Sequence, residues 1–258
     1  MKLKRTTYEI LQYLSTIDEI FAYSGDNVFI MREMSGSSFT EVEVKDFFNE
    51  QVIIRSLPKF LRLFSFPKPG KTDSNDVESF QEWTLEDHLN TKTGHVERQM
   101  LLKQGNHIVK VSQGQQRLME YHKVKHRFDE IKMGESVTFQ LTRAQYKQIV
   151  SDCSLLDLDM ITFTSLDEHK IQIYLSKKDS VTNTDYSTDT IECDHEHFPT
   201  KVTIMLNTFS LIDATDHQIE FGVCQLSEDH VVPVVKVKSF YTSETVVKRV
   251  IIGIRGDK

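Results

Sequence analysis

Apolar residues at helical spacing open the chain. A segment beginning near Thr6 places four of them on one face: Ile10, Leu11, Leu14 and Ile17. Thr6 and Glu9 have the spacing of a capping box, in which a hydroxyl and a carboxylate satisfy free N–H groups at a helix start. The pattern therefore predicts an amphipathic N-terminal helix that begins at Thr6.

Short apolar segments bounded by turn residues follow this helix. Ser24-Gly25 and Ser35-Gly36 are turn signals. Residues 57–66 predict a second short helix, which ends before Pro67 because proline cannot continue a helix. The predicted strands of the first half are 19–23, 28–31, 39–44, 51–55, 96–102, 107–111 and 116–128. Between them, the polar residues 71–94 predict an inserted loop or hairpin.

The second half repeats this order of elements. Thr142 and Gln145 form a second capping-box pattern, 136 positions after Thr6 in a chain of 258 residues. The apolar face expected for that helix consists of Tyr146, Ile149, Val150 and Cys153. Strands are predicted at 136–141, 159–163, 170–175, 201–206, 217–226, 231–240 and 246–254, with a short helix near 208–214.

Two similar halves favour a duplicated α+β fold. We predict domains at residues 1–132, with the insertion at about 67–95, and at 133–258. Each domain is expected to carry two short helices packed on antiparallel sheets. The prediction depends on the order of the patterns, since the sequence identity between the halves is poor.

Composition narrows the class of protein. Hydrophobic residues make up 39% and charged residues 27%, as in a globular protein, and no apolar run approaches the roughly 20 residues that cross a bilayer. The basic N-terminus lacks the apolar core of a signal peptide. Three widely spaced cysteines suggest no disulfide framework: Cys153, Cys193 and Cys224. We therefore expect a cytoplasmic protein without membrane contact.

The acidic net charge argues against DNA binding by overall Coulomb attraction. The formal net charge is −7, whereas domains that grip DNA by Coulomb attraction are usually basic. A nucleic-acid role would require basic residues gathered on one surface. A closed ring around DNA would need little affinity, because it cannot dissociate sideways.

The N-terminal 65 or so residues carry a specific set of positions, of which the run Phe29-Ile30-Met31 together with the later Phe60-Leu61 is the most telling part. The other residues of the set are Met1-Lys2-Leu3, Thr6-Thr7, Leu11, Leu14, Thr16-Ile17, Ser24-Gly25, Arg32, Gly36, Glu41, Val52, Ile54, Leu57 and Ser65. In these residues and their spacing the segment resembles the DNA sliding clamps of T-even bacteriophages. Beyond Phe66 the resemblance is one of pattern and total length, and the 71–94 insertion departs from a shorter family loop.

This resemblance implies the sliding-clamp fold and a processivity factor without catalytic site or cofactor. Such clamps are homotrimeric rings that encircle duplex DNA, and their partners are a DNA polymerase and an ATP-dependent clamp loader. Two helices in each domain line the ring. A clamp-fold scaffold that does not encircle DNA is an alternative, which retention on circular but not linear DNA would exclude.

If the predicted helices line a ring, their solvent faces should carry cations toward phosphate. The candidate DNA-facing residues are Lys4, Arg5, Lys59, Arg62, Arg143 and Lys147. The alternative is that these are ordinary solvated helix faces. The helix expected near Phe209 carries no Lys or Arg, which weakens the pattern there. Residues 122–127 are the densest basic run and, read as a strand end, would place Lys123, Lys125 and Arg127 on one face. They would form either a phosphate-facing patch or the solvated end of an interdomain connector.

The family resemblance also implies a pocket for partner peptides and a subunit interface. The pocket candidates are Val232, Pro233, Val234 and Ile252. The alternative is that Pro233 marks an edge strand and the others pack in the core. For the interface, strand 116–122 would pair with a strand near 189–194 of the next subunit, so Leu118, Tyr121 and Ile191 are the candidates. Proline at Leu118 would then give monomers.

An enzymatic alternative comes from the segment 193–197. On a strand, Cys193, His195 and His197 share one face, as three zinc ligands would. The sequence marks no fourth ligand and no base, and the chain has no glycine-rich phosphate loop and no G-x-S-x-G motif. Zinc content would separate this metal-dependent enzyme from a clamp. The leading prediction remains a clamp that is not an enzyme.

Overall fold

The structure is a computed structural model, in which the chain divides into two compact units. It describes residues 5–44, 48, 51–63, 82–89, 96–104, 107–114, 116–178, 186–192, 200–212, 215–227 and 230–254. Unit 1 contains Met1–Met31 and Asp46–Lys123, and unit 2 contains Arg32–Lys45 and Val124–Lys258. Each unit is described by itself below.

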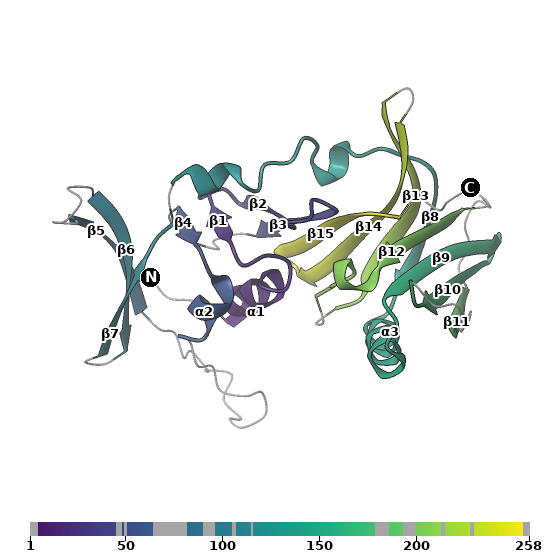
Figure 1. The fold of residues 1–258 in the computed structure, drawn as a ribbon, viewed down its shortest axis with the longest axis horizontal. Coiled ribbons are helices and arrows are strands. Elements are labelled where there is room, and N and C mark those ends of the chain that lie inside the picture. The colour runs from purple at the N-terminus through teal and green to yellow at the C-terminus, as the bar shows by residue number, and fades with distance from the viewer. Residues whose placement is uncertain are drawn as a thin grey trace. The chain divides into compact units, whose positions relative to one another are not determined.

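Unit 1 begins with helix α1 and contains two short sheets. Its elements are α1 (Arg5–Leu14), β1 (Phe21–Tyr23), β2 (Val28–Arg32), β4 (Val52–Ile54), α2 (Leu57–Leu61), β5 (Glu82–Leu89), β6 (Val96–Gln104), β7 (His107–Ser112) and the 3₁₀ helix η1 (Gln116–Glu120). β1 pairs with β4, and β5, β6 and β7 form an antiparallel three-stranded sheet in that order. Helices α1 and α2 lie side by side (Figure 1).

The predicted apolar face of α1 is confirmed, because Ile10, Leu11 and Leu14 are all fully buried. The predicted start is wrong: the helix already includes Arg5, so Thr6 lies inside it and does not cap it. Helix α2 begins after Ser56 with proline in its first turn, and its first N–H, that of Leu57, donates to Glu19 O at 2.7 Å. Residues 64–66 of the predicted helix lie outside the described residues.

Part of the polar insertion is ordered as a strand. β5 lies within residues 71–94 and pairs antiparallel with β6 along its whole length, from Glu82↔Lys103 to Leu89↔Val96. The rest of the insertion lies outside the described residues. The hairpin alternative is therefore confirmed for residues 82–89, and β7 forms one edge of the resulting sheet.

The predicted strand over 116–128 is wrong. Residues Gln116–Glu120 form a 3₁₀ helix, and the segment packs within unit 1 against the β1–β4 pair. The hydroxyl of Tyr121 donates to Asp18 Oδ2 at 3.4 Å, and His122 Nε2 lies 2.8 Å from Ile20 O. These contacts, which join residues about a hundred positions apart, determine the local conformation in place of strand pairing.

Unit 2 contains two antiparallel sheets. The first has the order β2, β3 (Ser38–Val44), β15 (Thr245–Ile252), β14 (His230–Thr242), β13 (His217–Ser227) and β8 (Met133–Leu141). Its edge strand β2 ends at Arg32, which belongs to unit 2. The second has the order β11 (Tyr186–Glu192), β10 (Lys170–Ser176), β9 (Met160–Asp167) and β12 (Lys201–Met205). Helix α3 (Arg143–Leu156) and the 3₁₀ helices η2 (Phe128–Glu130) and η3 (Leu206–Thr208) complete the unit.

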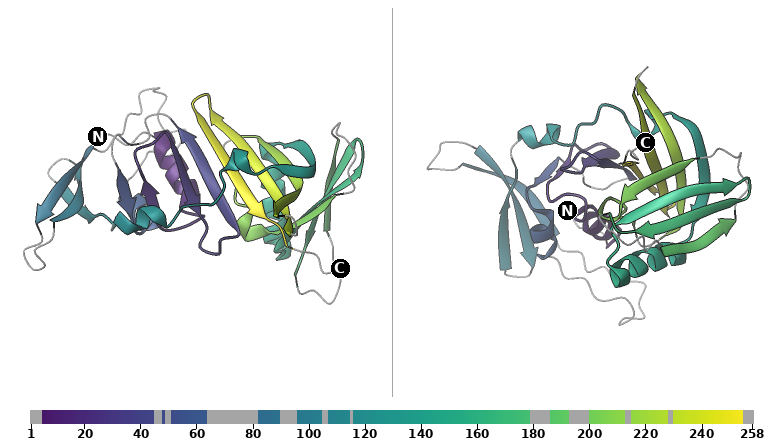
Figure 2. Two further views of the ribbon diagram at one scale, coloured as in Figure 1. Left: turned by 90° about the horizontal axis from the view of Figure 1, so that it is seen from above. Right: turned by 45° about the vertical axis from the view of Figure 1, so that its right-hand side comes forward.

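The core of unit 2 lies between these two sheets, with α3 covering one end of it (Figures 1 and 2). Tyr146, Ile149 and Cys153 of α3 join this core, whereas Val150 is 40% exposed, contrary to the predicted apolar face. The Thr142–Gln145 capping box is confirmed. The helix predicted near 208–214 is wrong, because the described part of this segment has only the 3₁₀ turn η3 and irregular backbone to Ile212.

The remaining predicted strands are all found within a few residues of their expected bounds. Among the residues that the structure describes, no helix is long and apolar enough to span a bilayer.

Gly222 permits close approach of β13 and β8. A Cβ atom at this position would lie 2.3 Å from the carbonyl oxygen of Glu135, so either strand would have to shift. We expect Gly222→Ala to lower the free energy of unfolding by about 1–3 kcal/mol through overpacking. Urea denaturation monitored by circular dichroism measures this. Gly134→Ala is the control, since its nearest atom is 3.5 Å away. Equal midpoints for the two variants would contradict the prediction.

Candidate functional site

The solvent face of α3 carries two of the predicted DNA-facing residues. Arg143 and Lys147 are exposed, one turn apart, opposite the buried Tyr146 and Ile149. The first turn is held by Asp216 Oδ1, which accepts from the backbone N–H of Arg143 at 2.7 Å. The helix contains one acidic residue, whose carboxylate accepts from Gln148 at 2.6 Å. The first two turns of α3 therefore present a cationic face to solvent.

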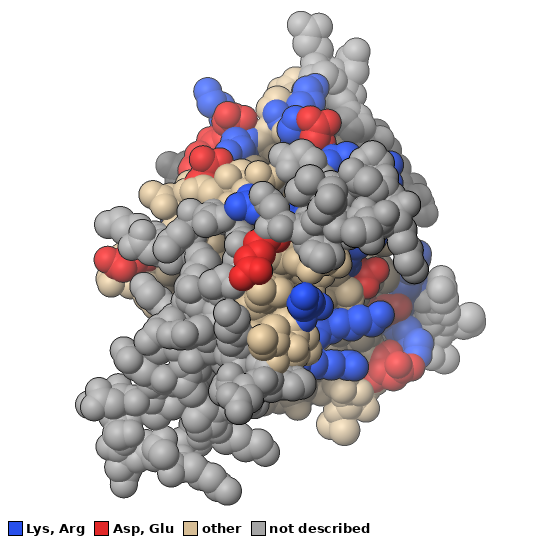
Figure 3. Space-filling model, turned by 90° about the vertical axis from the view of Figure 1, so that its left-hand side faces the viewer, with Lys and Arg blue, Asp and Glu red and all other residues tan. Residues whose placement is uncertain are grey.

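The first-half candidates are located less completely. Lys59 and Arg62 are exposed beside the buried Phe60 and Leu61, so they lie on the solvent face of α2 and its C-terminus, as predicted. Arg5 is the first residue of α1, but its side chain and the whole of Lys4 lie outside the described residues. On the face shown in Figure 3, described Lys and Arg side chains gather in a small group bordered by Asp and Glu, and elsewhere the two signs alternate.

The basic run 122–127 does not form a strand end with its cations on one face. It is a succession of turns and bends. Lys123 forms an ion pair with Glu120 at 2.8 Å, and Arg127 forms one with Glu41 at 2.8 Å. His122 is 4% exposed. Two of the three cations of the expected patch are thus already paired with carboxylates.

Three of the four predicted pocket residues share one face of the first sheet of unit 2, here called the outer face. Val232 and Val234 are buried there, and Ile252, the register partner of Val234 on β15, is 42% exposed. Pro233, between these two valines on the strand, points to the opposite face, and its carbonyl accepts from Gly253 N at 2.8 Å. Pro233 does not mark an edge strand, because β14 pairs with both β13 and β15. Core packing is confirmed for Val232 and Val234.

Sequence reasoning missed the residues that cover this outer face. A compact apolar cluster joins the two valines to the segment after the basic run: Phe128, Cys224, Val232, Val234 and Val250, with Phe39, Ile131 and Met133 packed against it. The apolar residues at 128, 131 and 133 were the available signal. They were obscured because residue 128 was assigned to the end of a predicted strand.

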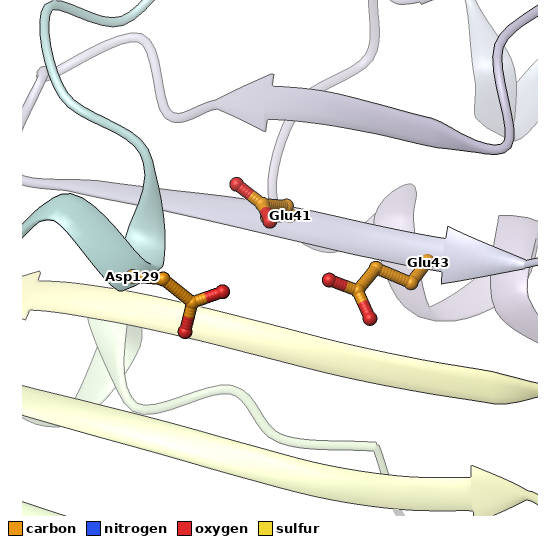
Figure 4. A group of neighbouring side chains, drawn as sticks. All are labelled: Glu41, Glu43 and Asp129. Atoms are coloured by element: carbon orange, nitrogen blue, oxygen red, sulfur yellow. The ribbon is translucent and has the colours of Figure 1, made fainter.

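Three carboxylates lie together beside this cluster. Oxygens of Glu41, Glu43 and Asp129 lie within 4.8 Å of one another. Two come from β3 and the third from η2 (Figure 4). Lys248 Nζ lies 2.6 Å from Glu43 Oε1 and 2.7 Å from Asp129 Oδ2. Together with Arg127 on Glu41, these contacts form a network of alternating charge, so each of the three carboxylates already has a cation of the chain beside it.

The network shifts the proton affinities of its members. The hydrogen bond from Lys248 lowers the pKa of Asp129. Burial alone would lower the pKa of Lys248, but its hydrogen bonds to Asp129 and Glu43 raise it above the ordinary value. The hydrogen bond to Glu41 raises the pKa of Arg127. Each shift favours the charged form, which is the expected behaviour of ion pairs.

The other predicted sites are not assembled by the described residues. Cys193, His195 and His197 lie outside the described part of the chain. Burial raises the pKa of the Cys153 thiol to about 11, so this cysteine is unreactive in the folded protein. Leu118 and Tyr121 are half-buried in unit 1, and Ile191 is buried in the core of unit 2 opposite Ile171. A strand pairing through residues 116–122 is therefore not supported.

Comparison with known proteins identifies the fold. No protein-family model matches the sequence, and no curated protein matches it. Among solved structures, the proliferating cellular nuclear antigen of Entamoeba histolytica is 14% identical and matches over 98% of both chains, with a TM-score of 0.51. The H. pylori beta clamp in complex with diflunisal is 10% identical over 96% of this chain and 64% of that chain, with a TM-score of 0.55.

A second structure of the H. pylori beta clamp, in complex with 5-chloroisatin, gives a TM-score of 0.53 at 10% identity and covers 63% of that chain. The chain therefore spans just under two thirds of the length of the beta clamp. These matches show that the chain has the sliding-clamp fold, α+β with antiparallel sheets and few short helices. At this identity the likeness concerns the fold alone.

The lowered pKa of Asp129 makes a prediction about acid stability. A depressed folded-state pKa stabilises the protein above the ordinary value of about 3.9, and this stabilisation is lost as the pH falls through the folded value. The Asp129 side chain is 69% exposed, so Asp129→Asn should cost no more than about 1 kcal/mol at pH 7 and almost nothing at pH 2–3. Urea titrations at both pH values measure the difference.

Glu244→Gln, at an exposed carboxylate in the turn after β14, is the control for this substitution. It should change stability little at either pH. A loss in Asp129→Asn that is the same at pH 7 and in acid would show that the ion pair with Lys248 contributes nothing.

Proposed function

We propose that this chain is a DNA sliding clamp, a processivity factor that encircles duplex DNA as a homotrimer and tethers a DNA polymerase. The observation that carries the proposal is the sliding-clamp fold, matched over 98% of both chains by the Entamoeba histolytica protein. The resemblance of the N-terminal residues to T-even bacteriophage clamps supports a viral clamp acting in the bacterial cytoplasm and loaded by an ATP-dependent clamp loader. The proposed role is topological and not enzymatic.

In this proposal the boundary between the two clamp domains lies near residue 132 of the sequence. β8 begins at Met133, directly after the segment that contains η2, and starts the second series of helix and strands. Residues 32–45 group with unit 2 because β3 pairs with β15 over seven residue pairs. This pairing is compatible with a boundary at 132, since a strand of one domain extends a sheet of the other.

The cationic helix faces are the proposed DNA contacts. Arg143 and Lys147 on α3, with Lys59 and Arg62 at α2, would meet phosphate oxygens, while Lys4 and Arg5 stay predictions. Phosphate contacts of this kind carry no sequence information and suit a ring that slides. The net charge of −7 fits this role, since a ring is retained by topology and needs only weak local attraction.

For the ring interface we propose the open strand edges β7 and β11 in place of residues 116–122. Each strand lies at the edge of its sheet and has one partner strand, β6 and β10 respectively. Exposed edges are ready to pair with another chain. Ile108 of β7 is 52% exposed, an apolar side chain on such an edge. Pairing β7 of one copy with β11 of the next is a head-to-tail contact, which closes into a ring when the rotation allows.

The outer face of the first sheet of unit 2 is the proposed partner-peptide surface. Ile252 is 42% exposed there, and half-buried Phe39, Ile131 and Met133 surround the buried Val232 and Val234. An apolar patch bordered by charged groups is typical of a surface that accepts a peptide with apolar anchors. A polymerase or a clamp loader would dock through such a peptide.

The mass of the protein tests the ring. We expect light scattering to give about 90 kDa, three times the 30.0 kDa chain. Ile108→Asp should reduce this mass toward that of the monomer, because it introduces a charge at the proposed interface. Met34→Asp is the matched control, since Met34 is an exposed apolar residue outside β7. A folded Ile108→Asp protein that stays trimeric would rule out the β7 interface.

The same preparation distinguishes a clamp from a clamp-fold scaffold. After incubation with a nicked circular plasmid, the trimer should co-elute with DNA on gel filtration and be released when the plasmid is linearised. Equal retention on circular and linear DNA would contradict encirclement.

Reversing charge on α3 tests the DNA contacts. Arg143→Glu with Lys147→Glu should weaken binding to a short duplex about tenfold or more and lower the dependence of log Kd on log salt by about one or more. Fluorescence anisotropy at several salt concentrations measures both quantities. The control is Lys178→Glu with Lys201→Glu, two exposed lysines outside α3. Equal losses in the two double variants would indicate a nonspecific charge effect.

A further inference from the structure

Phe128 occupies the middle of the outer-face cluster. It is 6% exposed and packs with Cys224, Val232, Val234 and Val250. Lys236 Nζ lies 4.5 Å from the centre of its ring and Lys248 Nζ lies 5.6 Å from it. The ring of Phe128 is therefore held by apolar contacts and by two cation–π contacts.

The segment around Phe128, residues 127–131, is called the strap here. It is fastened by polar contacts on both sides of the ring. Arg127 pairs with Glu41 on β3, Asp129 pairs with Lys248 on β15, and Lys236 donates to the carbonyl of Ile131 at 3.1 Å. Within the strap, Glu130 accepts from the backbone N–H of Arg127 at 2.9 Å. The strap is thus a short preformed unit attached to the sheet by side chains.

The two ion pairs are exposed on the strap side and buried on the sheet side. The side chains of Arg127 and Asp129 are 44% and 69% exposed, whereas those of Glu41 and Lys248 are 4% and 6% exposed. The exposed members of these ion pairs keep them open to solvent ions, so salt screens them. Side-chain contacts, and not strand pairing, attach the strap to the sheet. The strap could therefore detach while the sheet stays folded.

Detachment would leave particular groups on the sheet without their partners. Glu41, a buried carboxylate, would lose its cation, and Lys248 would keep Glu43 but lose Asp129. A buried charge without its partner is costly. A segment that replaces the strap must therefore supply a cation, an aromatic ring and a carboxylate in the order of Arg127, Phe128 and Asp129.

We propose that the strap is a displaceable plug of the partner-peptide surface, and that the partner segment which replaces it has a basic–aromatic–acidic order. This rests on the proposed function, in which the outer face receives a partner peptide. The strap keeps the apolar patch covered in the free protein. A partner segment that makes the same contacts as the strap offsets the free energy that is needed to displace it. Salt, which screens the two ion pairs, favours the displaced form.

Cys224 gives a direct measure of strap opening, because it lies under the strap, while Cys153 lies in the core between the sheets. In a Cys193→Ser background, labelling by a thiol reagent followed by peptide mass analysis reports the two sites separately. We expect Arg127→Gln with Asp129→Asn to speed labelling of Cys224 about tenfold and to leave that of Cys153 unchanged. In the protein with an unsubstituted strap, raising NaCl to 1 M should also speed the labelling of Cys224, because salt screens the two ion pairs.

The control for these labelling rates is Glu120→Gln with Lys123→Gln, which removes an exposed ion pair outside the strap. It should change neither rate. If Cys224 and Cys153 label at one common rate in every variant and at every salt concentration, the strap opens only with global unfolding and the proposal is wrong.

The order of charges is tested with a peptide of the strap's own sequence. Fluorescein-labelled VKHRFDEIK, residues 124–132, should bind the Phe128→Ala protein at least tenfold more tightly than the unsubstituted protein, whose own strap competes. The exchanged peptide VKHDFREIK should lose that binding. Equal binding of both peptides would overturn the charge order. If Phe128→Ala does not fold, the Arg127→Gln, Asp129→Asn protein takes its place.

Both measurements use the free protein and neither requires DNA or a polymerase. A trimer that is retained on circular DNA but shows no selective Cys224 labelling would refute the strap alone. Selective labelling in a protein that forms no ring would refute the clamp and leave the strap as a property of the sheet.

Discussion

The pairing of β3 with β15 is the constraint on which the candidate partner surface depends. It joins residues more than 200 positions apart, from Thr245↔Val44 to Ile251↔Ser38, with Lys248 opposite Glu41. Because side chains alternate along a strand, this register puts Glu41, Glu43 and Lys248 on the outer face beside the strap. A shift of β3 by one residue would turn Glu41 and Glu43 to the core face and leave Lys248 on the outer face, and the network that fastens Asp129 and Arg127 would not form.

The same register determines what is buried on the other face. Arg249, 2% exposed, lies opposite Thr40, and its guanidinium donates to Thr40 Oγ1 at 3.3 Å and to Ser38 Oγ at 3.1 Å. A buried guanidinium that lost these hydroxyls would be strongly destabilising. The arginine thus opposes separation of β3 from β15 from the core side, while Lys248 does so from the outer side.

Sequence patterns predicted most elements whose formation depends on local periodicity. The buried face of α1, the Thr142–Gln145 cap and nearly all strands belong to this group, because burial of one face or local hydrogen bonding determines each of them. The errors occur where distant contacts override the local pattern. Residues 116–122 were predicted to belong to a strand but are held by Asp18 and Ile20, and the segment after Thr208 packs Phe209 into the core without forming an α-helix.

The candidate sites also divide into those that local periodicity predicts and those that depend on distant contacts. The exposure of Arg143 and Lys147 follows from helix periodicity, so sequence alone was sufficient to locate them. The outer-face cluster could not be found in this way, since it brings β3, η2, β13, β14 and β15 together through strand pairing. Phe128 was counted as one apolar residue at a strand end, and nothing near it in sequence marks Lys236 and Lys248 as its neighbours.

The proposed topological mechanism would explain how this fold exists at such low identity to its structural neighbours. Enclosing DNA requires a closed ring with weak phosphate contacts, and it requires no residue at an exact distance from a reacting bond. Cores accept many apolar substitutions when volume and pattern are kept. The positions under close constraint are then those where strands approach or charges are buried, such as Gly222 and Arg249. If the chain acts as a clamp of this kind, the residues that hold the sheets in register are under closer constraint than most surface side chains.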